Sequence, residues 1–309
     1  MSARADHRRD GPSPAGCRGA EKAFPGRGGT GRRRGRGAGY RCHAGDRRGR
    51  RRHVKIVAII QARMTSTRLP GKVLREVLGK PLLGYQVERL RRCCTIDEIV
   101  LATTVNATDD PVAAFAEAEG LRFWRGSEED VLARFAGAAE MAGADIVVRL
   151  TADCPLVDPG LVDEVVRTLT ESDPPLDYVS NAGSGTLPAG LDAEVMRAAA
   201  LFAAHAEAVE RQEREHVTPF IYNHRERFAC RMLRHEPPIE GQRWTVDQPE
   251  DFELVRRILE ALYPQNPAFT YRDVLALLAA HPDWIEINRT VSAKPKPVKN
   301  EDGAYPDEA

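Results

Sequence analysis

One basic stretch of the sequence has the composition of an anion-binding loop. Residues 61–72, QARMTSTRLPGK, follow the apolar run VKIVAII and contain hydroxyl side chains, Ser66 among them, together with Arg63, Arg68 and Lys72. Arginine can hold phosphate oxygens through two parallel hydrogen bonds, whereas lysine supplies a compact positive charge. Most phosphate loops are rich in glycine, but this stretch has one glycine only. Its charges therefore predict a bound anion, and its composition leaves open what completes the site.

Two acidic positions could complete such a site by holding a metal ion. Asp153 lies in RLTADCPLVDP and Asp247 lies in WTVDQPEDFELV, each after a run that reads as a strand. Mg²⁺ binds through a few carboxylate oxygens and takes its other ligands from phosphate and water. The basic loop and the two aspartates together predict a Mg²⁺–nucleotide site.

Each of these features also has an ordinary structural explanation. Asp153 before Cys-Pro could be a turn residue, and Asp247 before a helix could be an N-terminal cap. The basic side chains of the loop could simply face solvent. Taken singly, these explanations are the better ones, because turn and cap residues are common. Taken together, with each feature after a strand, a binding site is the better interpretation.

A second group of polar residues could contact another substrate. In GLDAEV, Asp192 and Glu194 alternate along an expected strand, which would put both carboxylates on one face as hydrogen-bond acceptors. The alternative is a solvent-facing polar stripe, the ordinary pattern of a strand. His216 in REHVTPFIY could act as a base or be structural, and Arg149 could meet an anionic group. These four residues are the candidates for the second substrate.

The elements around these residues predict the fold class. From residue 54 to residue 172, apolar runs alternate with helical patterns in the order βαβαβαβα. This predicts an α/β protein with a Rossmann-like, mostly parallel sheet covered by helices on both faces. The following half is irregular: residues 199–224 read as one helix, and RWTV reads as a strand before Asp247. Ligands bind at the carboxyl ends of strands in open α/β sheets, which is where the three loops lie.

Composition divides the chain into three parts. Residues 1–53 carry sixteen Lys or Arg against four Asp or Glu and have no Ile, Leu or Val, so this Arg/Gly-rich extension is predicted to be disordered. Residues 54–290 form the predicted domain, and residues 291–309 are a predicted disordered tail. The extension could bind nucleic acid, could be a targeting segment, or could lie outside a natural protein that starts at Val54. An Arg/Gly-rich tract is a weak sign of nucleic-acid binding, so no such partner is expected.

Cysteine use and hydropathy indicate the compartment. The six cysteines form no CxxC pair, which favours a reduced, cytoplasmic protein over a disulfide framework or a zinc site. No apolar run is long enough to span a bilayer, so no membrane partner is expected.

The motifs, in their order, resemble a known family of enzymes. Five of them span residues 54 to about 290: QARMTSTRLPGKVL, RLTADCPL, GLDAEV, REHVTPFIY and WTVDQPEDFELV. They are similar to the CMP-sugar synthetases, the acylneuraminate and 3-deoxy-manno-octulosonate cytidylyltransferases, and most to the branch named for the spore-coat polysaccharide biosynthesis protein SpsF. The resemblance implies a nucleotidyltransferase with a Rossmann-like sheet that transfers CMP from CTP to a sugar and releases pyrophosphate.

The resemblance also implies roles for individual residues. Thr151 stands two residues before Asp153, where relatives have a residue that contacts the nucleotide. Asp153 and Asp247 match the metal-binding acids, so the implied cofactor is Mg²⁺. Together with Arg68 and Lys72, these acids would be the catalytic groups. Four residues would hold the triphosphate: Arg63, Ser66, Arg68 and Lys72.

The expected function is therefore the CTP-dependent activation of an acidic or modified sugar for a polysaccharide or surface glycan. Arg149, Asp192, Glu194 and His216 would then face the sugar. One alternative is a nucleotide-sugar-dependent glycosyltransferase of the same fold, and another is a degenerate nucleotide-binding protein. The resemblance suggests a homodimer. The identity of the sugar and the preference for CTP over other nucleotides stay open.

Overall fold

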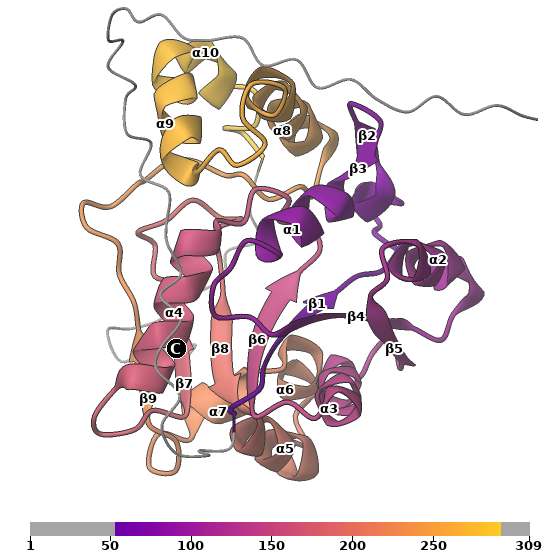
Figure 1. Ribbon diagram of the computed structural model, residues 1–309, viewed down its shortest axis with the longest axis vertical. Helices are drawn as coiled ribbons and strands as arrows, with labels where there is room; N and C mark the ends of the chain where they lie inside the picture. Colours follow the sequence, from indigo (N-terminus) through magenta and orange to yellow (C-terminus); the bar gives the residue numbers. More distant parts are fainter. Residues whose placement is uncertain (1–52, 292–309) are drawn as a thin grey trace, which may run out of the picture. The chain divides into compact units, whose positions relative to one another are not determined.

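A seven-stranded sheet forms the centre of the protein (Figure 1). The computed structural model describes residues 53–291, so the predicted disordered segments at 1–53 and 291–309 lie outside the described residues except for one residue each. The strands follow one another in the order β5-β4-β1-β6-β8-β7-β9. Only β8 runs opposite to its neighbours. The prediction of a mostly parallel sheet is confirmed.

Four parallel strands make up one side of this sheet: β1 (Ile56–Gln61), β4 (Glu98–Thr104), β5 (Arg122–Gly126) and β6 (Ile146–Thr151). Three shorter strands continue it: β7 (Tyr178–Ser180), β8 (Glu194–Arg197) and β9 (Cys230–Met232). A separate hairpin joins β2 (Glu76–Val77) and β3 (Lys80–Pro81). Gln61 at the end of β1 pairs with Thr151 at the end of β6, so the loops that follow these strands leave the same edge.

Helices cover both faces of the sheet, as predicted. One face packs against α1 (Leu82–Leu90), α2 (Asp110–Ala118) and α4 (Pro159–Glu171). The other face packs against α3 (Val131–Ala142), α5 (Ala198–Glu207) and α7 (Pro219–Asn223). Successive strand residues point to opposite faces, which is why Ile59 and Ile60 of β1 lie in different core clusters.

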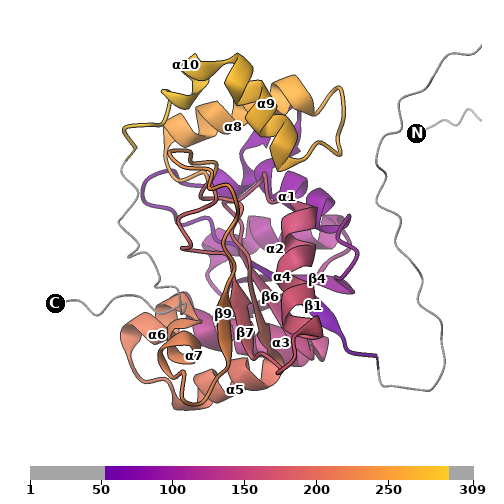
Figure 2. The same ribbon diagram turned by 90° about the vertical axis from the view of Figure 1, so that its left-hand side faces the viewer.

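A third apolar cluster holds the C-terminal helices α8 (Pro249–Leu262), α9 (Tyr271–Ala280) and α10 (Pro282–Ile285) against α1. Figure 2 shows these three helices gathered at one end of the domain, beyond α1. Trp244 and Val246 are fully buried in this cluster, which anchors the segment that leads into α8. None of the helices within residues 53–291 has the length and apolar character that a membrane crossing requires.

The single helix predicted over residues 199–224 is wrong, because the segment forms α5, α6 (Arg211–His216) and α7. The Glu210 side chain caps a new helix in a reciprocal arrangement with Glu213. Val217 then has a positive φ of 74°, and Thr218 N donates to His216 O at 2.9 Å, which closes a tight three-residue turn. Pro219, the first residue of α7, starts the next helix.

The strand predicted for RWTV is also wrong, since Arg243 makes only an isolated parallel bridge to Ala189. The carbonyl oxygen of Ala189 accepts hydrogen bonds from Trp244 N (2.7 Å) and Thr245 N (2.9 Å). This close approach requires Gly190, where a Cβ atom would lie 2.7 Å from Thr245 N and where φ is 112°. Gly190, the first residue of the GLDAEV motif, therefore allows Ala189 to hold in place the segment that carries Asp247.

Candidate active site

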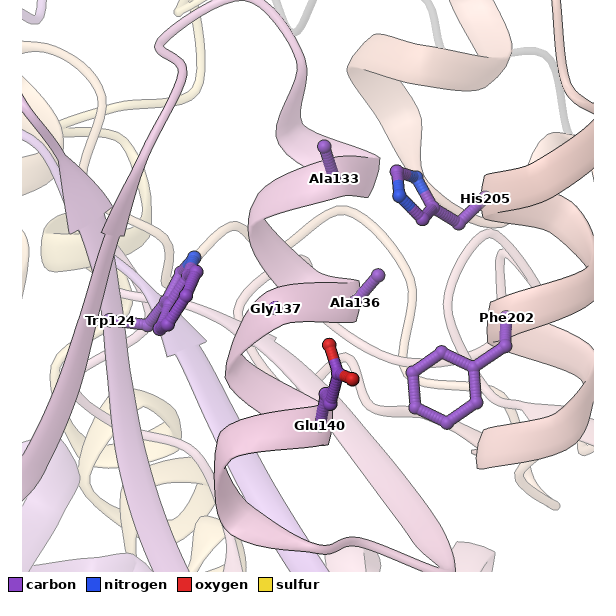
Figure 3. A pocket seen from close by; sticks show the side chains of 7 residues that line it. All are labelled: Trp124, Ala133, Ala136, Gly137, Glu140, Phe202 and His205. Atoms are coloured by element: carbon purple, nitrogen blue, oxygen red, sulfur yellow. The ribbon is translucent and has the colours of Figure 1, made fainter.

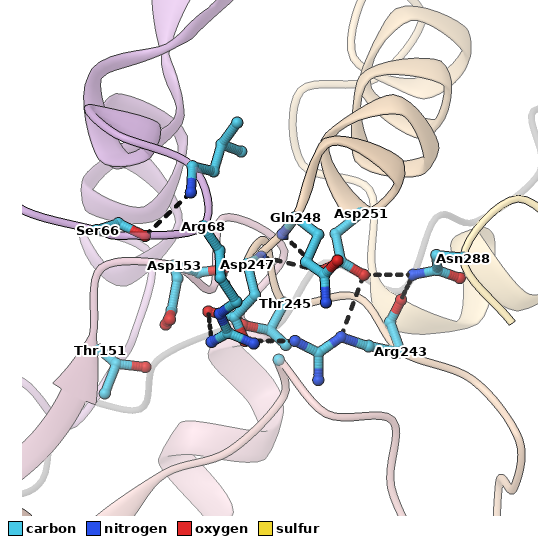
Figure 4. Close-up of polar contacts among 12 residues, drawn as sticks. Ser66, Arg68, Thr151, Asp153, Arg243, Thr245, Asp247, Gln248, Asp251 and Asn288 are labelled. Atoms are coloured by element: carbon cyan, nitrogen blue, oxygen red, sulfur yellow. Dashed lines mark hydrogen bonds and ion pairs between the residues drawn. The ribbon is translucent and has the colours of Figure 1, made fainter. Parts of the chain in front are cut away.

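The two predicted metal acids and the lysine of the basic loop meet in space. Lys72 Nζ donates hydrogen bonds to Asp153 Oδ2 (2.9 Å) and to Asp247 Oδ1 (2.8 Å). Arg68 from the same loop lies 3.0 Å from Asp247 Oδ1 (Figure 4). Three segments far apart in the sequence therefore form one charged cluster beyond the end of β6.

Main-chain hydrogen bonds fix these segments relative to one another. Val246 N donates to Asp153 O at 2.8 Å, which joins the two acidic loops directly. Within the basic loop, Gly71 N donates to Met64 O at 3.0 Å. Gly71 has the left-handed conformation (φ 68°) that glycine adopts without strain, and it places Lys72 at the start of the short helix η1 (Lys72–Leu74). The one glycine of the loop thus lies at the turn that presents Lys72.

The start of the basic loop is held by a buried carboxylate that the sequence analysis did not identify. Asp109 has no exposed surface, and its Oδ1 accepts a hydrogen bond from Met64 N at 2.7 Å. Its Oδ2 accepts from the hydroxyl and the backbone N–H of Thr104, the last residue of β4. An acid shortly after a strand was the available signal, the same one that pointed to Asp153.

Arg243 is the other residue of the cluster that sequence reasoning missed. Its guanidinium group contacts Asp247 Oδ2 and lies 3.1 Å from Asp251 Oδ1 (Figure 4). Asp247 therefore faces three cations, those of Lys72, Arg68 and Arg243. The available signal was an arginine four residues before the predicted metal acid.

The charges of this cluster shift one another's protonation. Burial alone would raise the pKa of Asp153, but the ammonium group of Lys72 and hydrogen bonds that include one from Thr151 lower it to about 2. Burial opposes ionisation of Asp247 in the same way, and Lys72 again holds its pKa below the ordinary value. Burial opposes the charge on Lys72, yet the two acids raise its pKa overall. All three groups are charged at neutral pH.

Two further residues predicted to bind the nucleotide, Thr151 and Ser66, make contacts within the loops that form this cluster. The Thr151 hydroxyl lies 3.4 Å from Cys154 Sγ, at the base of the Asp153 loop. Ser66 Oγ accepts a long hydrogen bond (3.4 Å) from Leu69 N inside the basic loop (Figure 4).

Arg63 points elsewhere in this structure. It is half-exposed, and it forms an ion pair with Glu128 at 3.0 Å. Glu128 also accepts hydrogen bonds from Thr65 (2.6 Å) and Asn106 (2.6 Å), which tie the basic loop to the segments that follow β4 and β5. The structure thus brings Arg68 and Lys72 to the acids and leaves Arg63 at the other side of the loop.

Arg149 and Glu194, two of the four sugar candidates, form a buried pair. Glu194 is 5% exposed, and its carboxylate contacts Arg149 and accepts hydrogen bonds from Tyr178 and from Thr218 (2.8 Å). Arg149 also donates to Gln61 Oε1 at 3.3 Å. The Glu194 carboxylate thus links β6 and β8 to the turn before α7. A role in sugar binding for Arg149 or Glu194 stays a prediction.

The other two sugar candidates lie apart from that pair. The expectation that Asp192 and Glu194 share a strand face is wrong, because β8 begins at Glu194 and Asp192 lies in the preceding loop. Asp192 Oδ2 accepts a hydrogen bond from Gly190 N at 3.3 Å. His216 ends α6 and is exposed. A contact of Asp192 or His216 with the sugar therefore stays a prediction.

The two carboxylates that surround Lys72 suit a divalent cation that also binds phosphate. Oxygens of Asp153 and Asp247 converge on one point, which the ammonium of Lys72 occupies here. Residues 53–291 contain no group of three or more His, Cys, Asp or Glu arranged to hold a metal ion. One or two carboxylates are nevertheless the usual protein ligands of Mg²⁺ when phosphate and water supply the others. The residues present therefore fit a Mg²⁺ ion that binds together with a polyphosphate.

A groove elsewhere on the domain contains none of the predicted site residues. It runs over α3 between β5 and α5, has a volume of about 380 Å³, and is shown in Figure 3. The floor is made by small residues of α3, and the walls carry aromatic side chains. The lining residues are Trp124, Ala133, Ala136, Gly137, Glu140, Phe202 and His205.

A Rossmann-like sheet with a basic loop after β1, Asp153 after β6 and Asp247 in contact with that loop is typical of a nucleotide-binding α/β protein. Comparison with known families makes this specific: the model of the cytidylyltransferase family matches residues 57–272, more than half of the 309-residue chain. The chain belongs to the cytidylyltransferase family.

Individual relatives agree with this assignment. An uncharacterized protein of Methanocaldococcus jannaschii is 36% identical over 245 residues, which cover 78% of this chain and 97% of that protein. The spore coat polysaccharide biosynthesis protein SpsF of Bacillus subtilis is 35% identical over 235 residues, covering 74% of this chain and 95% of SpsF. A solved cytidylyltransferase from Leptospira borgpetersenii superimposes with a TM-score of 0.73 at 30% identity and covers 78% of this chain and 100% of its own.

Proposed function

We propose that this protein is a Mg²⁺-dependent cytidylyltransferase that transfers CMP from CTP to a sugar hydroxyl and releases pyrophosphate. The observation that carries the proposal is the contact of Lys72 with both Asp153 and Asp247, in a chain that belongs to the cytidylyltransferase family. The similarity to SpsF, named for polysaccharide biosynthesis, supports a sugar as the acceptor and a glycan as the destination. Because CTP is a cytoplasmic nucleotide, we place the reaction in the cytoplasm.

The chemistry of the transfer explains why this cluster is charged. A sugar hydroxyl oxygen forms a bond to the α-phosphorus, the bond to the bridging oxygen of the β-phosphate breaks, and the hydroxyl proton is lost. Negative charge develops on the phosphoryl oxygens and on the departing pyrophosphate, so catalysis consists mainly of positioning and electrostatic stabilisation. Arg68 and Lys72 are the two cations of the basic loop placed to supply it.

Binding of the nucleotide requires these cations to change partners. Lys72 and Arg68 neutralise carboxylates in this structure, and a triphosphate competes for the same donors. Asp153 and Asp247 would then be free to hold Mg²⁺. When bound there, the ion neutralises phosphate charge and lowers the pKa of a nearby hydroxyl.

The experiment that tests the proposal measures pyrophosphate release and identifies the product by mass spectrometry. Each of the four nucleoside triphosphates is incubated with a panel of acidic and neutral sugars, in Mg²⁺ and in EDTA. The proposal predicts a CMP-sugar and pyrophosphate with CTP in Mg²⁺, and no turnover in EDTA. A glycosyltransferase would instead release a nucleoside diphosphate from a nucleotide-sugar, and a degenerate binding protein would bind CTP without turnover.

A family resemblance also suggests a homodimer, which is a separate part of the proposal. Light scattering during size-exclusion chromatography should give twice the 34.2 kDa chain mass. A single-chain mass at the concentrations used for activity would remove the dimer from the proposal and leave the reaction untouched.

A further inference from the structure

The two carboxylate oxygens of Asp247 have different partners. Oδ1 faces the basic loop, where it lies 2.8 Å from Lys72 Nζ and 3.0 Å from Arg68. Oδ2 faces away from the loop and contacts the guanidinium group of Arg243. Figure 4 shows Arg68 and Arg243 on either side of this carboxylate. Arg243 thus occupies Oδ2, and Oδ1 is the oxygen that faces the basic loop.

Arg243 is itself held by a fully buried acid. Asp251 has no exposed surface, and its Oδ1 lies 3.1 Å from Arg243 Nε. Its Oδ2 accepts hydrogen bonds from the backbone N–H groups of Asp247 and Gln248, both at 3.0 Å. The first turn of α8 therefore fixes the main chain of Asp247 and the side chain of Arg243 through one carboxylate.

The segment after α10 closes this arrangement. Asn288 is 4% exposed, and its Nδ2 donates to Asp251 Oδ1 (2.9 Å) and to Arg243 O (2.9 Å). A buried polar network with its members paired is rigid, since each group constrains the orientation of the next. Arg243 is consequently locked at both its main chain and its side chain (Figure 4).

We propose that Arg243 is a positioning residue for the transfer reaction, which orients Asp247 so that Oδ1 alone is presented to the metal and the triphosphate. The inference rests on the proposed function and adds a residue that does not itself touch the nucleotide. Residues that orient a metal ligand typically change metal affinity by about 10- to 100-fold when they are replaced. Without Arg243, the Asp247 carboxylate can turn and engage Lys72 with either oxygen.

The test measures the affinity for CTP alone, without sugar, by calorimetry in EDTA and again in Mg²⁺. The ratio of the two dissociation constants gives the gain that Mg²⁺ provides. Arg243→Met removes the contact with both acids. Arg243→Lys keeps the charge but lacks the planar group that reaches Asp251 and Asp247 side by side. The matched control is Arg256→Met, which removes a half-exposed arginine of α8 that pairs with Glu253 and Glu260.

For wild type and for Arg256→Met, the inference predicts the same increase of CTP affinity in Mg²⁺. For Arg243→Met it predicts CTP affinity in EDTA within about threefold of wild type, because Arg68 and Lys72 remain, and a Mg²⁺ gain reduced by about 10-fold or more. Arg243→Lys should lose part of the gain, and it decides the question if Arg243→Met does not fold.

Two results overturn the inference and leave the proposed function in place. One is an unchanged Mg²⁺ gain in a folded Arg243 variant. The other is an equal loss of affinity in EDTA and in Mg²⁺, which indicates a purely structural role. A wild-type protein that binds CTP equally in both conditions contradicts the proposed metal site, and a protein that does not bind CTP contradicts the proposed function as a whole.

Discussion

Lys72 Nζ lies 2.8 Å from Asp247 Oδ1, although 175 residues separate them in the chain. The basic loop after β1 and the segment before α8 are therefore parts of one site. The same ammonium group reaches Asp153 at 2.9 Å, and the cations and carboxylates of the cluster neutralise one another.

Replacing either acid should stop turnover and preserve the fold. Asp153→Asn and Asp247→Asn keep the shape of the side chain and remove the charge that would hold Mg²⁺. We expect the rate of pyrophosphate release to fall by about 100-fold or more, as for the loss of a group that stabilises transition-state charge. Thermal unfolding should stay cooperative in both variants. Near-normal turnover in one of them would remove that residue as a metal ligand.

Replacing Lys72 should weaken the binding of CTP and reverse the effect of pH on the stability of the fold. A hydrogen bond from a charged donor is worth about 1.5–3 kcal/mol, so Lys72→Met should bind CTP about 10- to 100-fold more weakly. In wild type the pKa of Asp153 is depressed from 3.8 to about 2. The stability it contributes is complete above its unfolded pKa and is lost as pH falls through the folded pKa.

In Lys72→Met the sign of this linkage changes. Burial and repulsion from Asp247 then raise the pKa of Asp153 above its unfolded value, whereas Asp247 keeps Arg68 and Arg243 as partners. Stability therefore falls as pH rises towards neutrality. The free energy of unfolding, measured with urea between about pH 3 and about pH 7, should differ between wild type and variant by an amount that grows with pH. Adding Asp153→Asn to Lys72→Met should remove most of this trend. A difference independent of pH would count against the assigned ion pairs.

Gly190→Ala should displace the segment that carries Asp247. An added Cβ atom would lie 2.7 Å from backbone atoms of Trp244 and Thr245, in addition to the strain of a φ of 112°. The control is Gly120→Ala, where φ is also positive (66°) but nothing lies within 4 Å. Strain at a single residue costs about 1–3 kcal/mol, so Gly120→Ala should lose that amount of unfolding free energy and keep its activity. Gly190→Ala should lose more stability and most of its activity, and equal losses would contradict the close approach.

Glu194→Gln should destabilise the protein, because this buried carboxylate balances Arg149 and accepts bonds from Tyr178 and Thr218. Removing one partner of a buried ion pair costs about 3–5 kcal/mol. His216→Ala, at an exposed position, should change the free energy of unfolding by less than about 0.5 kcal/mol. Denaturant titration of both variants checks this. A stable Glu194→Gln protein with a raised KM for sugar would instead favour the sugar-binding role predicted from the sequence.

Much of the fold could be predicted from the sequence because its first half is regular. Apolar runs such as VKIVAII and helices closed by glycine repeat in one order, and the four parallel strands follow that order. The second half was harder because its breaks depend on conformation. The positive φ of Val217, a residue type that avoids it, has no signature in composition. The segment around Arg243 forms no strand and pairs with Ala189 through an isolated bridge, which no local pattern indicates.

The candidate site was predictable where residue type and position after a strand agreed. Asp153 follows β6 and Lys72 lies in the loop after β1, as this reasoning requires. Asp247 was identified by the same reasoning although the run before it forms no strand, and the structure brings all three residues together. Arg243 was missed because an arginine before an aspartate has no distinct local meaning. Its importance comes from contacts with Asp247 and Asp251, which appear only once α8 has formed.

A crystal structure of the protein with CTP and Mg²⁺ would show whether the basic loop and the two acids form the triphosphate and metal site. We expect the triphosphate to contact Arg68 and Lys72, with Lys72 moved from its carboxylate partners to phosphate oxygens. We expect Mg²⁺ between phosphate oxygens and the carboxylates of Asp153 and Asp247. CTP bound elsewhere, or Lys72 still paired with both acids and no metal beside them, would contradict this assignment.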